Sequence, residues 1–588
     1  MRCGKLWRSG YGYYSNRTGA LRPRGGQQPA QPRGEGSVSV LEQVDLDHKT
    51  AKEDYKAEHD ALMARLIVLQ VKAMQAGIGT VVMFDGWKGA GKGSRISDLA
   101  YNLDARYMNV HTLSDFDVHA HREFCEKHPG VTGFYPFMQE FWGALGERGR
   151  MTIYEQGWYA AARRLMAKGD DPQARARETV ESIGDFERIL ADNGYVVVKF
   201  FVHISQKEQE RRLRKLADNP DTSWRLKGGG IPGKDEYAAR YEEFDKTLSL
   251  TDADHAHWVL VNGEDKRTAN LTIARTLVTE LERALSRKED PAAAAAARKA
   301  AENSAGALAQ ATDPRTRSAE ESALVLEAAR AQAAEQATFA PRHSRFKMVD
   351  RPVRLADVDN TLSLARADYS KALKEEQKRL GELELKMYRA RVPLMIVYEG
   401  DDAAGKGGNI KRVAQAIDAR GYTVFPSAVP TKPELMHPFL WRYWTRLPKA
   451  GHVGIYDRSW YGRILVERVE GFASPEEVFH AYDEINEFER ELVEWGAILL
   501  KFWVAVDPDE QLRRFEEREA NPAKQWKITP EDWRNRDKHP QYAAAVDDMF
   551  RLTSTPAAPW RILESTDKLH ARVKALRTIN KALEDRLG

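Results

Sequence analysis

Two glycine-lysine loops carry the residue types that bind phosphate. The first reads Gly86-Trp87-Lys88-Gly89-Ala90-Gly91-Lys92, and the second reads Gly400-Asp401-Asp402-Ala403-Ala404-Gly405-Lys406. Each has a glycine, four residues, a glycine and a lysine, and each follows an apolar run typical of a buried strand. In such a loop the backbone N–H groups and the start of the next helix face one anion. The loops differ at one chemically decisive position, because the first has Lys88 where the second has Asp402.

The second loop has an unusual supply of metal ligands. The Ser or Thr that follows the lysine in an ordinary phosphate loop and binds Mg²⁺ is absent, since Gly407 and Gly408 stand there. Asp402, and Asp457 at the end of a predicted strand, offer carboxylate oxygens instead, which suit Mg²⁺ and also Mn²⁺. Arg458 follows directly, and its guanidinium matches phosphate oxygens. The predicted catalytic residues are Asp402, Lys406, Asp457 and Arg458, with Asp402 and Asp457 as the metal ligands.

Further residues are predicted to bind phosphate around this centre. Lys411 and Arg412, just past the loop, would line the approach path. A later basic group would form a mobile lid over the phosphates, whereas Arg513 reads as part of a solvated helix face. The predicted loop residues are Gly400, Ala403, Ala404, Gly405, Gly407 and Gly408, and the predicted lid residues are Arg514, Arg518, Lys524 and Lys527.

The loops belong to a repeat of a whole domain. They lie 314 residues apart (406 minus 92), and motifs further on lie 302 apart, such as Trp158-Tyr159 with Trp460-Tyr461. The first copy therefore carries 12 extra residues (314 minus 302), which we place between His111 and Phe141. The period is too long for a solenoid, so each copy is a domain large enough to bury its own core.

The repeat defines the expected domain organisation. We predict a disordered basic tail over 1–40, a first copy over 41–285, an Ala-rich helical linker over 286–345 and a second copy over 346–588. In the second copy, strands are expected at 393–398, 422–425, 452–456, 498–506 and 560–563. The intervening helices are expected at 362–389, 408–420, 437–446, 475–494 and 508–518. Alternating strands and helices predict an α/β fold in which each copy is a parallel sheet between helical layers.

Composition limits the class of protein more than its partners. The chain has 588 residues with 90 basic and 87 acidic ones, so whole-chain charge points neither to nucleic acid nor to a membrane surface. No apolar run approaches the length of a membrane span. The two cysteines, Cys3 and Cys125, cannot form a disulfide framework, and a cytoplasmic protein is expected. A homo-oligomer is also compatible with the sequence.

The second copy resembles the family-2 polyphosphate kinases. The resemblance covers about 360–585 and rests on four motifs. They are Glu399 to Gly408, His437-Pro438-Phe439-Leu440-Trp441-Arg442, Tyr456 to Arg463, and Asn521 to Lys527 with Pro530-Glu531-Asp532-Trp533. It implies tandem P-loop kinase-like domains with a helical lid, and Mg²⁺-dependent phosphoryl transfer between inorganic polyphosphate and a nucleotide. Two fused domains resemble the subgroup that phosphorylates AMP to ADP.

The first copy has lost the predicted chemistry. Asp402 corresponds to Lys88, Asp457 to Glu155 and Arg458 to Gln156. A lysine beside Lys92 repels Mg²⁺, so we predict that 41–285 is a degenerate, non-catalytic domain that packs against the other or tethers polyphosphate. His437 of the second copy is expected to pack or cap rather than to catalyse.

Other functions remain open at the level of sequence. Polyphosphate could phosphorylate ADP or GDP instead of AMP, or the donor could be ATP, as in thymidylate kinases. A protein that stores phosphate polymers without turnover is a further alternative. The intact set around Lys406 argues against storage, and the Asp402 position argues against ATP.

Overall fold

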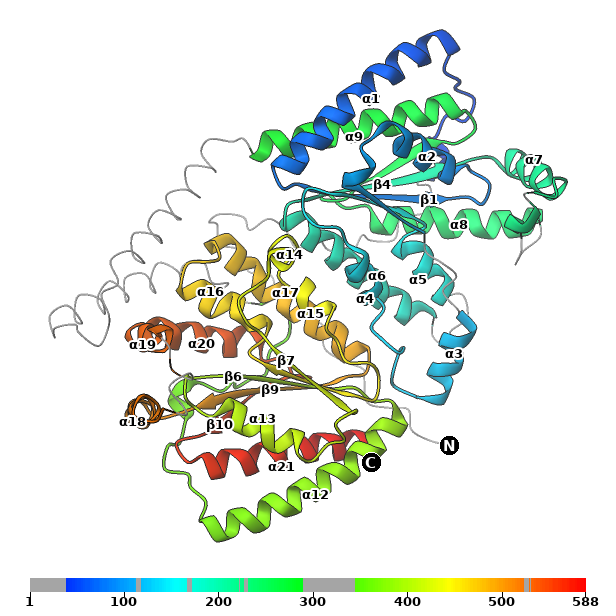
Figure 1. The fold of residues 1–588 in the computed structure, drawn as a ribbon. Helices are drawn as coiled ribbons and strands as arrows, with labels where there is room; N and C mark the ends of the chain where they lie inside the picture. The colour runs from blue at the N-terminus through cyan, green and yellow to red at the C-terminus, as the bar shows by residue number, and fades with distance from the viewer. Residues whose placement is uncertain are drawn as a thin grey trace, which may run out of the picture.

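A computed structural model describes residues 39–112, 118–166, 172–221, 223–226, 231–288, 344–522, 528 and 530–588. Nearly all of the predicted tail (1–40) and linker (286–345) lies outside these ranges, as do Lys524 and Lys527. Figure 1 shows two α/β units, one from each copy of the repeat.

Each copy contains one five-stranded parallel sheet, and the two sheets have the same strand order. The first runs β2-β3-β1-β4-β5 and the second runs β7-β8-β6-β9-β10. The strands of the first copy are β1 (Gly79–Gly86), β2 (Met108–Thr112), β3 (Met151–Glu155), β4 (Tyr195–His203) and β5 (Trp258–Asn262). Those of the second are β6 (Leu394–Gly400), β7 (Tyr422–Pro426), β8 (Val453–Asp457), β9 (Ile498–Ala505) and β10 (Trp560–Glu564). The predicted parallel α/β fold is confirmed.

Helices cover both faces of each sheet (Figure 1). The first copy has α1 (Lys52–Gln75), α2 (Lys92–Asn102), α3 (Val118–Lys127), α4 (Gln139–Ala144), α5 (Trp158–Met166), α6 (Pro172–Asp192), α7 (Gln206–Ala217), α8 (Lys234–Thr251) and α9 (Lys266–Lys288). The second copy has α12 (Arg366–Ala390), α13 (Lys406–Ala414), α14 (Lys432–Leu435), α15 (Trp441–Trp444), α16 (Val466–Val469), α17 (Pro475–Glu494), α18 (Pro508–Glu519), α19 (Pro530–Asp537), α20 (His539–Thr553) and α21 (Lys568–Leu587). Short 3₁₀ turns occur at Leu41–Gln43, Ala105–Tyr107, Ser223–Leu226, Leu355–Asp357 and Trp460–Ile464.

Capping residues explain several helix boundaries in the second copy. α17 starts as predicted at Pro475, because Ser474 forms a capping box with Glu477 and proline is favoured in the first turn. Two other helix predictions were wrong in extent. The helix expected over 408–420 starts earlier, at Lys406, and ends at Ala414, and only Trp441–Trp444 is α-helical within 437–446.

A buried ion pair explains why the tryptophan motifs repeat. In the second copy the Lys501 Nζ donates to Glu489 Oε2 at 2.6 Å, and Glu489 also accepts from Trp460 and Tyr461. In the first copy the Lys199 Nζ donates to Glu187 Oε2 at 2.8 Å, and Trp158 donates to Glu187. Removing one member of such a pair would leave a buried charge uncompensated, so these motifs are structural.

The two copies pack through equivalent surfaces, as expected for a pseudo-twofold axis. Trp142 stacks on Trp444, its own counterpart 302 residues later, with ring centroids 6.0 Å apart. Two ion pairs repeat each other in the same way, Arg188 with Glu487 and Arg490 with Asp185. Such self-complementary contacts are the hallmark of an isologous interface. The duplicated chain therefore has the internal arrangement of a dimer.

The extra residues of the first copy lie after β2. Strands β2 and β7 keep the offset of 314 (422 minus 108), whereas Trp142 and Trp444 have the offset of 302 (444 minus 142). The insertion therefore includes α3, and the chain after it docks on the second copy. Thr132 N donates to Trp495 O at 3.0 Å, and Trp495 Nε1 donates to Gly133 O at 2.8 Å. The segment that follows α3 is thus part of the joint between the copies.

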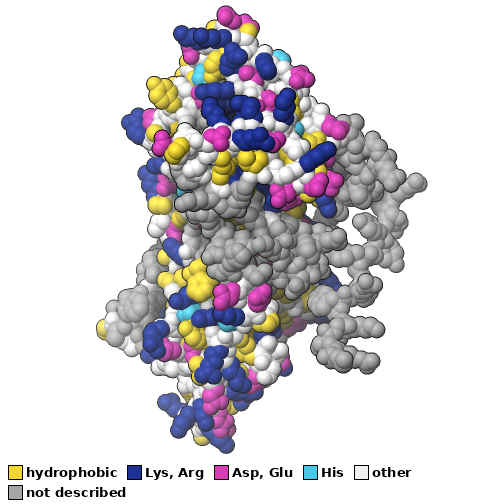
Figure 2. Space-filling model, turned by 90° about the vertical axis from the view of Figure 1, so that its right-hand side faces the viewer, with side chains coloured by type: hydrophobic (Ala, Val, Ile, Leu, Met, Phe, Trp, Pro, Cys, Tyr) yellow, Lys and Arg dark blue, Asp and Glu magenta, His cyan; other side chains and the backbone are white. Residues whose placement is uncertain are grey.

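The surface carries charges of both signs. In Figure 2, Lys and Arg side chains gather on the upper unit, which is the first copy, with acidic side chains among them. Many are paired along α7, as Arg211 is with Glu208 and Arg214 with Glu210. Within the described part of the chain, none of the helices combines the length and hydropathy needed to span a bilayer.

Candidate active site

The second loop is shaped by backbone conformations that place Lys406 at the start of a helix. Gly400 has φ of 143°, and a Cβ there would lie 2.3 Å from Val504 O, so no larger residue fits. Ala403 has φ of 59° and Gly405 has φ of 110°, and α13 then begins at Lys406. Left-handed conformations at non-glycine residues are strained and cluster at functional sites. The Lys406 Nζ donates to Gly400 O at 2.6 Å and to Asp401 O at 3.0 Å, so it lies across the loop.

Asp402 is fixed by donors from two other elements. Its Oδ1 accepts from Arg458 Nη2 at 2.9 Å, and its Oδ2 accepts from Asn535 Nδ2, on α19, at 2.7 Å. Burial favours the neutral acid, but the charges of Lys406 and Arg458 and these hydrogen bonds outweigh it and lower the pKa of Asp402. The side chain is 13% exposed. Asp402 is therefore a charged and mostly buried carboxylate of the loop.

Asp457 and Arg458 lie beside the loop because their strands are paired. Tyr398 of β6 is in register with Asp457 of β8, and Arg458 N donates to Tyr398 O at 3.0 Å. Arg458 has φ of 61°, which turns the chain sharply at the strand end. No described residue donates a hydrogen bond to the carboxylate of Asp457. The structure thus brings the four predicted catalytic residues to one edge of the sheet.

The donor set at this edge fits a hard divalent cation. Asp402 and Asp457 supply two carboxylates at the carboxyl ends of neighbouring strands, and Mg²⁺ commonly takes one or two carboxylates with phosphates and waters. In the part of the chain that the structure describes, no group of three or more His, Cys, Asp or Glu gathers as an all-protein metal site. The arrangement suits a metal that is shared with a bound phosphate rather than one enclosed by protein.

Two further acids at the loop were missed in the sequence. Glu399 is 5% exposed, accepts from Ser459 Oγ at 2.8 Å, and has a raised pKa because it is buried. Asp401 accepts from Val506 N at 3.0 Å, and burial raises its pKa to about 6. Both flank Gly400, so proximity to the loop was a usable signal. Asn535 gave no such signal, because it reaches Asp402 only through the fold.

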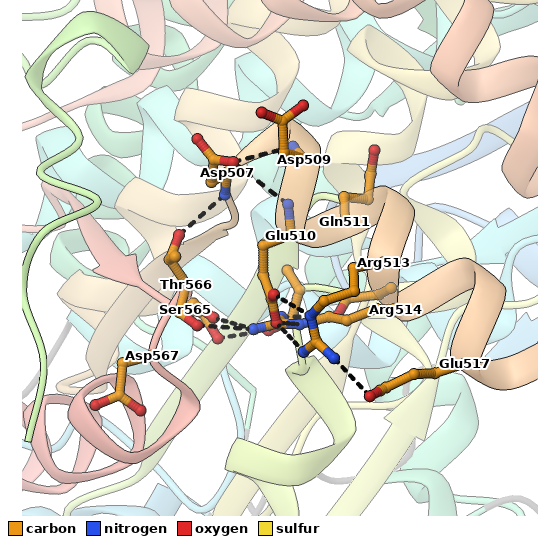
Figure 3. A network of polar contacts seen from close by, with 12 residues as sticks. Asp507, Asp509, Glu510, Gln511, Arg513, Arg514, Glu517, Ser565, Thr566 and Asp567 are labelled. Atoms are coloured by element: carbon orange, nitrogen blue, oxygen red, sulfur yellow. Dashed lines mark hydrogen bonds and ion pairs between the residues drawn. The ribbon is translucent and has the colours of Figure 1, made fainter. Parts of the chain in front are cut away.

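The prediction that Arg514 belongs to a mobile lid was wrong. Arg514 is 3% exposed, and its Nη atoms donate to the carbonyl oxygens of Ala403, Ala404, Ser565 and Thr566, while Nε binds Glu510 (Figure 3). Every donor direction points into the protein, so the side chain braces the back of the loop. Arg513 pairs with Glu510 and Glu517 at the surface, as its solvated position predicted.

The other predicted phosphate-binding residues have less definite surroundings. Lys411 is exposed on α13, and Arg412 Nη1 is 3.4 Å from Gly408 O on the same helix. A Cβ at Gly408 would lie 3.1 Å from Arg572 Nη2, so Arg572 of α21 is a further cation beside the start of α13. Arg518 lies in the last turn of α18. Lys524 and Lys527 lie outside the described residues.

The first loop has a backbone conformation like that of the second, but different side chains surround it. Gln156 has φ of 60° and its N donates to Phe84 O at 2.9 Å, as Arg458 does to Tyr398. Lys92 is 7% exposed, its Nζ donates to Gly86 O and Trp87 O, and burial lowers its pKa. Trp87 in turn stacks on Tyr237 of α8, with ring centroids 4.0 Å apart. The lysine is thus held inside the protein.

In the first copy, an arginine also pairs with the acid that precedes the loop. Asp85 corresponds to Glu399 (399 minus 314), and its Oδ2 accepts from Arg163 Nη2 at 2.6 Å. Glu155 remains near the loop, since a Cβ at Gly93 would lie 3.6 Å from Glu155 Oε1. The first copy therefore retains the scaffold of a phosphate site with its charges satisfied internally.

The chain matches one family model in both copies. The model, described as polyphosphate kinase 2, matches residues 49–289 and 363–587. These ranges contain both sheets and both loops.

Curated relatives match over nearly the whole chain. A protein from Pseudomonas syringae pv. tomato named polyphosphate:AMP phosphotransferase is 36% identical over 93% of this chain and 98% of its own length. One of the same name from Pseudomonas aeruginosa is 35% identical over 93% of this chain and 99% of its own. A solved structure described as a polyphosphate kinase 2 from Pseudomonas aeruginosa has a TM-score of 0.71 at 33% identity, covering 92% of this chain and 97% of that one.

Proposed function

The chain belongs to the polyphosphate kinase 2 family, and from this we propose that it transfers the terminal phosphoryl group of inorganic polyphosphate to AMP, giving ADP. AMP is favoured over ADP and GDP because the relatives that match both copies are named for AMP. The observation that carries the proposal is the convergence of Asp402, Lys406 and Arg458 on one phosphate loop.

The residues of the second copy divide the work by position. Lys406 and the N–H groups of its loop bind the terminal phosphate of the donor and neutralise its charge. Arg458 binds an oxygen of the transferring group after exchanging Asp402 for phosphate. An oxygen of the AMP phosphate forms the new P–O bond as the bond to the shortened polyphosphate breaks, and no covalent enzyme intermediate is needed.

Asp402 and Asp457 are the residues that would hold Mg²⁺. A bound Mg²⁺ supplies charge stabilisation to phosphate oxygens at this point. Asn535 orients the Asp402 carboxylate for that task. Mn²⁺ suits the same oxygen ligands.

We assign no phosphoryl transfer to the first copy. Supporting this are Lys88 in place of Asp402, the Arg163–Asp85 pair and the burial of Lys92, which is 7% exposed. The burial of Lys92 also argues against a polyphosphate tether at this loop.

An assay with four acceptors and two donors tests the proposal. AMP, GMP, ADP and GDP are each incubated with polyphosphate or with ATP, in the presence of Mg²⁺, and the products are separated by chromatography. We expect the fastest product to be ADP, from AMP and polyphosphate. Turnover with ATP alone, or with ADP but not AMP, would contradict the assignment of donor or acceptor.

A further inference from the structure

We propose that the first copy serves the reaction by holding in place the segment Ser427–His437 of the second copy, which we call the acceptor arm. The proposal gives the degenerate domain a task in catalysis other than chemistry. It rests on the proposed function, because the arm matters to turnover only if a nucleotide is accepted beside Asp457 and Arg458.

The arm begins at the catalytic residues. It follows β7, the strand next to β8 at the sheet edge. Ser427 N donates to Asp457 O at 3.0 Å, and Ser427 Oγ donates to Arg458 O at 2.9 Å. Displacing the arm would therefore also move the turn that carries Asp457 and Arg458.

The arm lies on the side of the phosphate loop where β8 and β7 extend the sheet. On the opposite side, beyond β9 and β10, the space is filled by Arg514 and its contacts with Ser565 and Thr566. The acceptor must approach in line with the transferring phosphoryl, away from the loop that binds the donor. The strand ends of β8 and β7 face that approach, and Val429 of the arm is 86% exposed there.

The middle of the arm is stiffened by one buried acid. Glu434 is 6% exposed and accepts from Thr431 N, and it pairs with Arg442 and Arg446. Arg442 Nη1 also donates to Ala428 O at 3.1 Å. Because these contacts join both halves of the arm, a constraint at its far end is transmitted to its catalytic end.

The far end of the arm is bound by the first copy. Arg148 N donates to Met436 O at 2.8 Å, and Arg148 Nη2 donates to His437 O at 3.0 Å. Tyr195 Oη is 3.4 Å from Met436 O. The His437 ring, 5% exposed, lies between Leu145 O at 3.2 Å and Pro433 O at 2.7 Å and stacks on Trp441. His437 packs, as the sequence predicted, but against the other copy.

Arg148 and His437 are accordingly positioning residues for the acceptor. Losing the Arg148 side chain removes one anchor while the backbone bond to Met436 remains, so the fold is kept. The Michaelis constant for AMP should rise on the order of tenfold, because small misplacement of a binding element is costly. The Michaelis constant for polyphosphate, which binds at the Lys406 loop, should stay near the wild-type value.

Steady-state kinetics of the full-length chain test this, with AMP and polyphosphate varied separately. The variants are Arg148→Ala, Arg148→Lys, and His437→Phe, which keeps the stack on Trp441 but removes both imidazole contacts. Arg150→Ala is the matched control, because the Arg150 Nη1 donates to Arg106 O within the first copy. Thermal melting is recorded for each variant.

The expected result is a selective rise in the Michaelis constant for AMP in Arg148→Ala and His437→Phe. This rise should be smaller in Arg148→Lys and absent in Arg150→Ala. An unchanged constant for AMP in both variants would overturn the inference. Equal rises for both substrates, together with lower melting temperatures, would also overturn it by showing a merely structural joint. If the wild-type chain makes no ADP at all, the proposed function fails instead.

Discussion

Asp402 depends on a side chain that the local sequence does not reveal. Asn535 belongs to α19, 133 residues further on, and its Nδ2 donates to Asp402 Oδ2 while its Oδ1 accepts from Tyr542. The chain Tyr542–Asn535–Asp402 thus orients one carboxylate oxygen and leaves its other lone pair for a metal. Partners of metal ligands typically affect metal affinity or activity by 10–100-fold.

Replacing Asn535 by Ala should therefore weaken the metal site without disturbing the fold. We expect turnover to fall by about 10-fold, and the Mg²⁺ concentration for half-maximal activity to rise, since the carboxylate loses its orientation. A Mg²⁺ titration of ADP formation measures both effects. Tyr542→Phe, which removes only the outer bond, should have a smaller effect of the same sign. Unaltered Mg²⁺ dependence in Asn535→Ala would show that the contact has no such role.

At the scale of elements, each phosphate loop is braced by an arginine from a charged helix, α7 in the first copy and α18 in the second. Arg514 of α18 bonds to four carbonyl oxygens and to Glu510. Arg212 of α7 makes the equivalent contacts with Gly89, Ala90, Gly263, Glu264 and Glu208. A guanidinium suits this position, because its planar set of donors serves several acceptors at once. The first copy keeps this brace although its loop has Lys88 in place of Asp402.

Matched variants separate stability from catalysis here. Arg514→Ala and Arg212→Ala each take the guanidinium donors away from buried carbonyl oxygens, so each should lower the free energy of unfolding of its domain by about 2–4 kcal/mol. Only Arg514→Ala should also lower kcat, because only its loop binds the donor. Urea denaturation and ADP formation, measured on the same preparations, give the two readouts. Equal kcat losses in both variants would contradict the division of labour between the copies.

The sequence predicted the elements well but not the roles of their charges. The parallel sheets between helical layers followed from alternating apolar runs and amphipathic helices, because these are local patterns. Arg513 lies on a solvated helix face as predicted, but Arg514, which was assigned to the lid, points in a different direction from the same helix and faces the loop. Helix periodicity does not predict that a loop distant in the sequence will bury the Arg514 side chain. Asn535 and Arg163 were missed for the same reason.

At the scale of the molecule, the joint between the copies includes a buried acid. Glu484 of α17 is 3% exposed, and its Oε1 accepts from Asn193 Nδ2 of the first copy at 3.2 Å. Burial raises the pKa of Glu484 to about 7, against the partial compensation of Arg188. The folded protein thus binds this proton more tightly than the unfolded chain does.

This shift makes stability depend on pH in a defined direction. Because the folded pKa is raised, the stabilisation is complete below the unfolded pKa and is lost as pH rises through about 7. Glu484→Gln, which cannot ionise, should be more stable than wild type by about 1–3 kcal/mol at pH 8.5, and similar to it near pH 4.5. Denaturation at both pH values measures the difference. A variant with the wild-type pH dependence would show that Glu484 does not titrate in this range.

The duplication itself was visible in the sequence, but the pseudo-twofold packing was not. Trp158 and Trp460 belong to motifs that keep the same offset along the chain, and this indicated a repeat, since duplicated cores keep the same buried residues. Trp142 stacks on Trp444, 302 positions further on (444 minus 142), and Arg148 binds His437 of the acceptor arm, 289 positions further on (437 minus 148). No local pattern marks such contacts. The fold of each copy was therefore predictable, and the joint between them was not.

The central claim is that the second copy carries out the reaction and the first does not. Asp457→Asn and Glu155→Gln change equivalent acids by the same single atom, at strand ends of the same register. The direct test is the initial rate of ADP formation from AMP and polyphosphate with Mg²⁺ in these two full-length variants. The account predicts that Asp457→Asn loses at least about 100-fold in turnover, while Glu155→Gln retains the wild-type rate. A comparable loss in Glu155→Gln, or full activity in Asp457→Asn, would contradict it.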